Sequence, residues 1–472
     1  MRTAPLFILV AALCIYAWKD WFRSLCGLII LTAVVMRHEF PTSLAGIQGL
    51  NLWNLLLVNV ILAWLANRTR EGLRWDMPRD IGVLLILWLC VLLLAFMLMV
   101  ADRDRLRLSL TNLISDDLVN TIKWVVPSLL VFDGCRTRRR ARMVLTSILF
   151  VFILFILQIS SAIAPKAVLQ EGNSEARMRL DSETGLSPNG AGKMMSGVPW
   201  AMLAAIPLLK KRRHRFLMIA MCAGGIYAVA LAGSRSGFIA CFATLLLLCL
   251  LRWRRYLPVL PLVVIVASIV LPGAAARMLS GFGETDVAGE DVANTLEITS
   301  GRNEIWKAVI PRILESPVWG HGRRAMPRIG VTQQLVNEHG EYSGLAVHHP
   351  HCAYLELLLE SGLIGLVIVM GLHLRIWIYA VRLFAARGDP IYTVTGGVAL
   401  ALLTGHLVAH LGGQSFYPRE IDICLWCAIG LMLRVHVEER SLAAQVGDMS
   451  YQYAYRQGQH TFSGIPLGGS YS

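Results

Sequence analysis

Charged side chains are scarce in this chain of 472 residues: only 16% are charged, 56% are hydrophobic and the mean hydropathy is +0.57. A soluble domain is about half apolar and about a quarter charged, so this composition excludes an ordinary soluble protein. Acidic residues are also few, 31 against 44 basic ones, which gives a net charge of +13 and a pI near 9.5. Nucleic-acid-binding proteins share such a balance. Basic residues that cluster between apolar runs, however, indicate membrane orientation instead.

Long apolar runs occupy most of the chain. A helix needs about 20 residues to cross a bilayer. The clearest runs are 81–100, 143–164, 216–233, 256–273, 352–374, 393–411 and 421–435; shorter or more mixed runs are 5–18, 25–36, 50–66, 118–132, 191–209 and 237–251. Strands of a membrane barrel would alternate in polarity over about ten residues, which these runs do not do. We therefore predict an all-α polytopic membrane protein with about 12–13 transmembrane helices.

Lys and Arg gather in short segments between the runs, most densely at 68–79, 136–142, 210–215 and 252–255. Because positive residues stay on the cytoplasmic side of a membrane, we place these four groups inside, facing anionic lipid head groups. The segments 165–189, 234–236 and 274–350 then lie outside. Thirteen spans would put the N-terminus outside and twelve would put it inside. The basic charge is thereby assigned to membrane topology, and no nucleic-acid partner is expected.

The chain divides into an N-terminal transmembrane bundle (1–273), an extracytoplasmic loop (274–350), C-terminal transmembrane helices (351–437) and a cytoplasmic tail (438–472). The loop lacks cysteine, which excludes a disulfide-stapled module. Apolar residues at helical spacing predict amphipathic helices at 303–314 and 331–336, covering a cavity between spans. The tail is rich in Gly, Ser, Tyr and Gln, so we expect it to be disordered.

Charged groups within or at the ends of spans are costly, so they are the first candidates for function. Arg235 lies in a glycine-flanked break, Gly-Ser-Arg-Ser-Gly, and Arg302 begins the predicted loop helix. His351 immediately precedes the span 352–374. Further candidates are His348, His349, Lys123 and Lys193. Each has a simpler explanation: Arg235 at the lipid head groups, Arg302 as a solvated helix residue, His348 as a loop residue, and Lys123 paired with Asp116 or Asp117.

These residue types suit one chemistry. Arginine forks bind phosphate oxygens in pairs, and a histidine with a near-neutral pKa can take a proton from a hydroxyl. A lipid-embedded phosphate ester or pyrophosphate that enters between spans would need this set. Three histidines could also indicate zinc, but no HExxH or similar spacing is present. We therefore expect neither a metal nor a cofactor.

Several motifs occur in a characteristic order. They are Pro188-Asn189, Gly-Ser-Arg-Ser-Gly at 233–237, Gly-Arg followed by Glu, Trp and Pro-Val-Trp-Gly-His-Gly within 301–322, and His351 followed by Gly-Leu-Ile-Gly at 362–365. Together they resemble the O-antigen ligase and polymerase family of bacterial membrane glycosyltransferases. The resemblance covers about 187–366. One departure is Cys352, where the family usually has an amide or a hydroxyl residue.

The resemblance implies a GT-C-like membrane glycosyltransferase of the bacterial inner membrane that acts at the periplasmic face. It implies an inverting, metal-independent transfer of a glycan from undecaprenyl pyrophosphate to an acceptor hydroxyl. By resemblance, Arg235 and Arg302 grip the pyrophosphate and His351 is the catalytic base. Further substrate-binding residues would be Lys193, Asn189 and His349. The acceptor would be lipid A core, a growing glycan or a protein.

Other functions stay open. Within the family, the chain could be an O-antigen or exopolysaccharide polymerase or a protein O-oligosaccharyltransferase. Outside it, an anionic-solute transporter would also use outward arginines and interrupted spans, although no matching inverted half is visible. A scaffold without catalysis is a further alternative. Acceptor recognition would lie at 281–299 and 325–347, and the Gly362–Gly365 spacing is more typical of close helix contact than of catalysis.

Overall fold

The computed structural model describes residues 4–37, 40–41, 43–44, 47–106, 108–162, 174–270, 302–340 and 347–462, together with Pro272 and Met278. Helices make up most of this part, and a hairpin of β1 (Ser43–Leu44) and β2 (Ile47–Gln48) is its one sheet. The predicted all-α class of membrane protein is confirmed. The proposed acceptor region 281–299 lies outside the described residues, as do 341–346 of the second acceptor region, 325–347.

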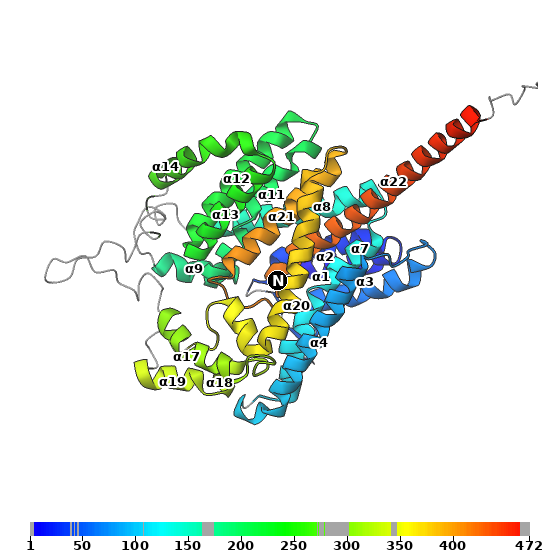
Figure 1. The fold of residues 1–472 in the computed structure, drawn as a ribbon. Coiled ribbons are helices and arrows are strands. Elements are labelled where there is room, and N and C mark those ends of the chain that lie inside the picture. Colours follow the sequence, from blue (N-terminus) through cyan, green and yellow to red (C-terminus); the bar gives the residue numbers. More distant parts are fainter. Residues whose placement is uncertain are drawn as a thin grey trace, which may run out of the picture.

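Each predicted apolar run falls on helical structure (Figure 1). The helices that match single runs are α1 (Ala4–Ala17), α2 (Trp21–Val35), α3 (Leu52–Arg68), α4 (Arg79–Ala101), α8 (Arg138–Ala162), α12 (Arg212–Ala232), α13 (Arg235–Leu251), α14 (Leu260–Val270), α20 (Ala353–Ala385), α21 (Pro390–Ala409) and α22 (Ile423–Phe462). Among the described residues, α4, α8, α12, α20 and α21 are long and apolar enough to cross a membrane, and α1, α2, α3 and α13 are shorter apolar helices. The number of spans, about 12–13, stays a prediction.

Two predicted spans are broken. The run 118–132 is divided among a π-helical turn η2 (Ile114–Val119), α6 (Asn120–Lys123) and α7 (Val126–Gly134), with Pro127 in the first turn of α7. The run 191–209 is divided between α10 (Pro188–Met195) and α11 (Val198–Ala205), with Pro199 in the first turn of α11. A proline lacks the amide donor that a continuous helix needs, so each run restarts at its proline.

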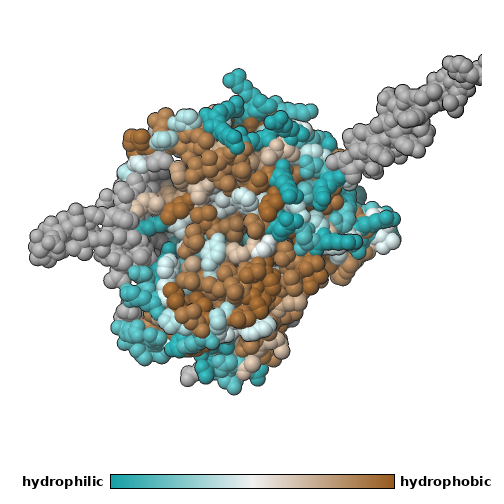
Figure 2. All heavy atoms as spheres, viewed as in Figure 1, coloured by the Kyte–Doolittle hydropathy of each residue, from teal (hydrophilic) through white to brown (hydrophobic). Residues whose placement is uncertain are grey.

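The apolar helix α21 lies at the centre of the molecule, between α20, α13 and α11. Most of it is buried, and its glycines let neighbouring backbones approach: a Cβ at Gly396 would lie 2.5 Å from the Phe384 nitrogen of α20. Small residues at a helix crossing leave out the side chains that would hold the two backbones apart, so the helices pack closely. On the outer surface, hydrophobic residues cover the middle of the face drawn in Figure 2, as expected where lipid surrounds a protein.

The segment 302–340 forms a small helical layer against the first half of α20. It contains α17 (Arg302–Glu315), α18 (Ala325–Arg328) and α19 (Val331–His339), which lie together at the lower edge of Figure 1. The predicted helices at 303–314 and 331–336 therefore form. Their apolar faces share a core with Leu359 of α20, made of Ile305, Val309, Val331 and Leu335. This layer attaches the helix that begins at Arg302 to the helix that follows His351.

A break in α20 receives the loop that follows α17. Gly362 has a left-handed φ of 62°, and a Cβ there would lie 2.2 Å from the Val318 carbonyl oxygen, so only glycine fits. The loop closes the break with hydrogen bonds from the His321 nitrogen to Leu359 O and from the Leu363 nitrogen to Pro317 O, both 2.8 Å. The expected close packing holds for Gly365, where a Cβ would meet Val91 of α4 at 3.3 Å. Gly362 instead makes the bend.

The last helix extends into the predicted tail, 438–472: α22 runs to Phe462. Disorder of the tail stays a prediction. Glu, Arg, Leu, Ala and Gln follow the last apolar residues between 438 and 445, and these side chains favour a helix. Residues 463–472 lie outside the described part of the chain.

Candidate functional site

Arg235 is the first residue of α13, at the sharp junction with α12. Gly233 ends α12 in the left-handed conformation, with a φ of 56°, and the Ser234 side chain caps α13 by accepting a hydrogen bond from the Gly237 nitrogen at 3.4 Å. The junction rests on α10, where a Cβ at Gly192 would lie 2.6 Å from the Ser234 Cβ. The glycines flanking Arg235 therefore create a tight turn that fixes the position of its backbone.

Arg302 is the first residue of α17 and reaches the segment that follows α21. Its Nη2 donates a hydrogen bond to the Gly412 carbonyl oxygen at 3.2 Å. Among the described residues it forms no ion pair with a carboxylate. Burial lowers the pKa of Arg302 most, and the positive charge of Arg235 lowers it further against an opposing effect of Cys352. The two arginines thus lie close enough to repel each other.

His351 stands in a loop that is held on both sides. The Trp306 indole of α17 donates a hydrogen bond to Pro350 O at 2.9 Å, and the Ala353 nitrogen donates one to His410 O at 3.0 Å. Between these anchors His351 has a φ of 52°, which is uncommon for a residue with a side chain. Such strain persists only where the surroundings enforce it, and it gathers at functional sites.

Burial, then His349 and then Arg302, lower the pKa of His351 to about 4. The imidazole is therefore neutral near pH 7 and can accept a proton. The His349 ring packs edge-on against it, with ring centroids 4.3 Å apart. Cys352 is the N-cap residue of α20, and its side chain makes no cap hydrogen bond. The charge of Arg235 lowers the pKa of Arg302, and the charge of Arg302 lowers the pKa of His351, so the three leading candidates lie near one another.

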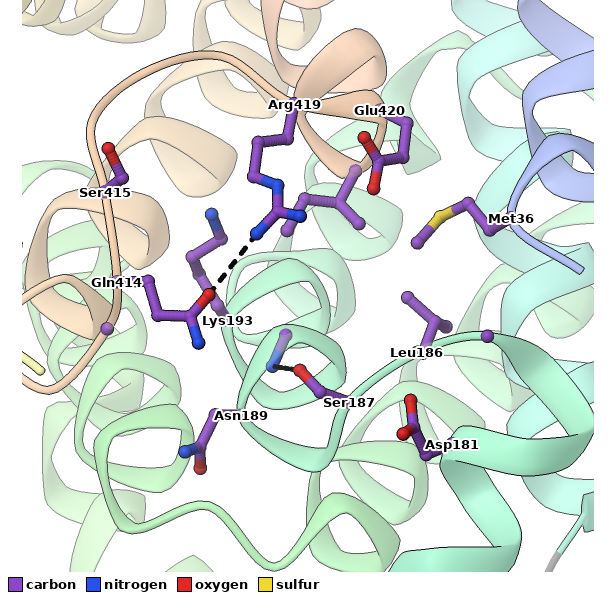
Figure 3. Close-up of a pocket in the computed structure, with 14 residues that line it drawn as sticks. Met36, Asp181, Leu186, Ser187, Asn189, Lys193, Gln414, Ser415, Arg419 and Glu420 are labelled. Atoms are coloured by element: carbon purple, nitrogen blue, oxygen red, sulfur yellow. Dashed lines mark hydrogen bonds between the residues drawn. The ribbon is translucent and has the colours of Figure 1, made fainter. Parts of the chain in front are cut away.

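Asn189 and Lys193 line a separate cavity of about 300 Å³ between α10 and residues 413–421 (Figure 3). The Lys193 ammonium lies 3.4 Å from a carboxylate oxygen of Asp422, and both side chains are buried. Arg419 crosses the cavity wall and donates a hydrogen bond to the Gln414 side chain at 3.3 Å. Lys193 is therefore charge-paired.

Sequence reasoning missed three charged residues at the start of the last apolar run: Arg419 and Glu420 just before it, and Asp422 at its second position. Their place at the end of a span is the signal that could have found them. For Lys123 the sequence left open a pairing with Asp116 or Asp117 beside a functional role. In the structure the Lys123 ammonium lies over the Trp124 ring, 4.2 Å from its centroid, and Asp117 pairs with Arg323 and Arg324. An aromatic ring face attracts a cation, as a carboxylate does. Both kinds of side chain lie near Lys123 in the sequence, so the sequence alone does not tell which one its ammonium contacts.

Residues 216–370 match the family model of O-antigen ligase, which confirms the resemblance predicted from the motifs. The matched range contains Arg235, Arg302 and His351 and ends within α20, whereas Asn189 and Lys193 precede it. No curated protein matches the chain.

Proposed function

We propose that this chain, a membrane enzyme of the O-antigen ligase and polymerase type, transfers a glycan from undecaprenyl pyrophosphate to an acceptor hydroxyl at the periplasmic face of the bacterial inner membrane. One observation carries the proposal. Two mutually repelling arginines lie beside a neutral, partly buried histidine whose loop is held in a strained conformation. The family match supports the enzyme class.

The chemistry follows from these groups. Arg302 and Arg235 bind oxygens of the pyrophosphate, whose negative charges relieve the repulsion between the two guanidinium groups. The acceptor oxygen attacks the anomeric carbon as the bond from that carbon to the pyrophosphate oxygen breaks. The bond electrons leave with the pyrophosphate, where the arginines stabilise the growing charge. His351 takes the acceptor proton on a ring nitrogen. Attack opposite the leaving group inverts the anomeric centre.

The secondary candidates receive positioning or contact roles. His349 packs against His351 and fixes the orientation of its ring. Asn189 and Lys193 contact substrate through the cavity that they line. Asp422 balances the charge of Lys193. A substrate would therefore interact with the Lys193 ammonium as a hydrogen-bond donor and not as a net positive charge.

The test is the glycan phenotype of a strain that lacks the protein, complemented with the wild type or with Arg235→Ala. We expect the deletion and the variant to lose the transferred glycan and to accumulate its lipid-linked form. Long lipid-linked polymer absent from lipid A core indicates a ligase, single repeat units indicate a polymerase, and unglycosylated secreted proteins indicate a protein ligase. Unchanged surface glycans, or loss of uptake of an anionic solute, would refute the proposal.

Gly412→Ala tests the position of Arg302 without removing any reacting group. An added Cβ would lie 2.6 Å from Arg302 Nη1 and 2.8 Å from the Ser236 Cβ, so the guanidinium must move. Displacing a positioning group by about 1 Å can cost on the order of 10²-fold in rate. We expect a loss of that order in glycan transfer at normal protein level.

The matched control is Gly371→Ala on α20, where the nearest atom, a methyl carbon of Leu84, is 3.7 Å away and an alanine fits. Full transfer by Gly412→Ala would mean that the place of Arg302 beside Gly412 does not matter for the reaction.

A further inference from the structure

A second cavity, of about 510 Å³, opens beside the proposed base. Its walls come from η2 and α6, from the loop at 323–324, from the histidine loop, from the first turns of α20 and from residues 415–420. His349 forms part of the wall, and its ring contacts His351. Ser415, Arg419 and Glu420 line both this cavity and the smaller one that contains Lys193. Only the His349 side chain would therefore lie between a molecule bound in this cavity and the proposed base, His351.

Buried polar atoms without a hydrogen-bond partner gather in this cavity wall. They include Glu356 Oε2, Arg323 Nε and His349 Nδ1, while Glu360 Oε2 has only a long ion pair with Arg323 Nη1, at 3.5 Å. The Glu360 residue is only 4% exposed. Buried polar atoms in native proteins almost always have partners, so a group of unsatisfied ones around a single hollow indicates a polar occupant. Acceptor oxygens on two glutamates call for an occupant that donates hydrogen bonds.

The charges of the wall disfavour an anion. Arg323 pairs with Asp117 at 3.2 Å and with Glu360 at 3.5 Å, and its guanidinium lies 3.5 Å from the Tyr417 ring centroid. Arg324 pairs with Asp117 at 2.9 Å. Arg323 and Arg324 are therefore already paired, whereas Glu356 and Arg419 have no ion pair with a described residue. Acidic side chains outnumber arginines in the wall: Asp116, Asp117, Glu356, Glu360 and Glu420 stand against Arg323, Arg324 and Arg419, which favours a neutral ligand over a phosphate.

A metal ion fits no better. In the part of the chain that the structure describes, no three His, Cys, Asp or Glu side chains converge in a way that could hold one. Aromatic side chains, Trp124 and Tyr417, complete the wall. A neutral sugar has hydroxyl donors and an apolar ring face. The carboxylates and the Asn120 amide can hydrogen-bond to its hydroxyls, and the aromatic side chains can contact its ring face.

We propose that this cavity binds an uncharged sugar ring of the glycan acceptor, with Glu356 and Glu360 accepting hydrogen bonds from its hydroxyls. The proposal rests on the proposed function. The pyrophosphate of the donor belongs at Arg235 and Arg302, so the cavity that adjoins the base suits the sugar that supplies the attacking hydroxyl. Glu356 is a binding residue in this assignment. Transfer would then depend on it through acceptor affinity.

The test measures binding to the purified full chain in detergent. The probe is the mixture of free neutral sugars released by acid hydrolysis of the host's own surface polysaccharide, observed by saturation-transfer NMR. We expect at least one sugar to bind, and Glu356→Ala and Glu356→Gln to weaken that binding by tenfold or more. The matched control is Glu315→Ala, which removes an exposed glutamate of α17 and should bind as the wild type does. Retained binding of inorganic pyrophosphate shows that each variant is folded.

The outcomes separate the two proposals. If pyrophosphate binding requires Arg302 while no sugar binds, or binds equally well to Glu356→Ala, the cavity assignment is wrong and the proposed function survives. If sugar binding depends on Glu356 but pyrophosphate binding is indifferent to Arg302, the cavity binds a sugar, but the proposed function fails and the acceptor assignment fails with it. If Glu356→Ala weakens binding of the lipid-pyrophosphate-linked donor as much as that of the free sugar, the cavity holds the donor and the acceptor assignment is overturned.

Discussion

Replacing His351 is expected to lower the rate of glycan transfer by about 10²- to 10⁴-fold, the usual contribution of a general base, with little change in donor affinity. Two variants are needed because His351 has a φ of 52°. Alanine is strained in that conformation, whereas asparagine tolerates it and cannot act as a base near neutral pH. His351→Asn is therefore the decisive variant, measured as transfer from purified lipid-linked donor at equal protein level.

The control for this variant is His214→Asn, which changes an exposed histidine in the first turn of α12, away from both cavities, and should retain transfer. A second measurement follows from the pKa of His351, which burial, His349 and Arg302 lower to about 4. A base acts when deprotonated, so kcat/KM should fall only as the pH drops toward 4, well below the ordinary value for histidine of about 6.5. The negative charge of bound pyrophosphate raises this pKa, so the fall in kcat should come at higher pH. Full activity of His351→Asn would remove histidine from the mechanism.

The leading candidates could be found from sequence because each has a local signal. Arg235 is flanked by glycines between two apolar runs, Arg302 begins an amphipathic helix, and His351 immediately precedes a span. A charged group at a span end is costly wherever the chain folds, so it stands out without knowledge of the tertiary structure. The same holds for the helices, since apolar runs of sufficient length predict them directly. The structure adds that these three residues lie close enough together for their charges to affect one another.

The parts that escaped prediction depend on pairs distant in sequence. Asp117 and Arg323, which form one wall of the larger cavity, are 206 residues apart. Glu356 and Glu360 lie on one face of α20 by their spacing, but sequence does not tell which residues cover that face. Pairing of Lys193 with Asp422 depends likewise on how α10 meets the segment before α22. Such contacts arise from packing, and no periodicity in a single sequence contains them.

Arg302→Ala is expected to lower transfer by about 10²- to 10³-fold, the typical loss when one preorganised donor to a developing negative charge is removed. Arg302→Lys should recover only part of this, because an ammonium lacks the planar fork that binds two phosphate oxygens at once. Donor binding and transfer are both measured, with inorganic pyrophosphate as a competitor. The matched control is Arg312→Lys, a partly exposed arginine on the same helix that pairs with Glu315. Full activity of Arg302→Lys would mean that Arg302 supplies only a point charge.

The double variant Arg235→Ala/Arg302→Ala distinguishes a shared ligand from two separate roles. If both arginines hold one pyrophosphate, losing either leaves it badly seated, so the second substitution should add less in free energy than it costs alone. The repulsion that lowers the pKa of Arg302 acts in the same direction, since removing Arg235 relieves it in the empty site. Strict additivity of the two losses would place the arginines on different groups of the substrate. A coupling of about 0.5–3 kcal/mol is the range found for residues that act on one another directly, and it is the result that a common pyrophosphate requires.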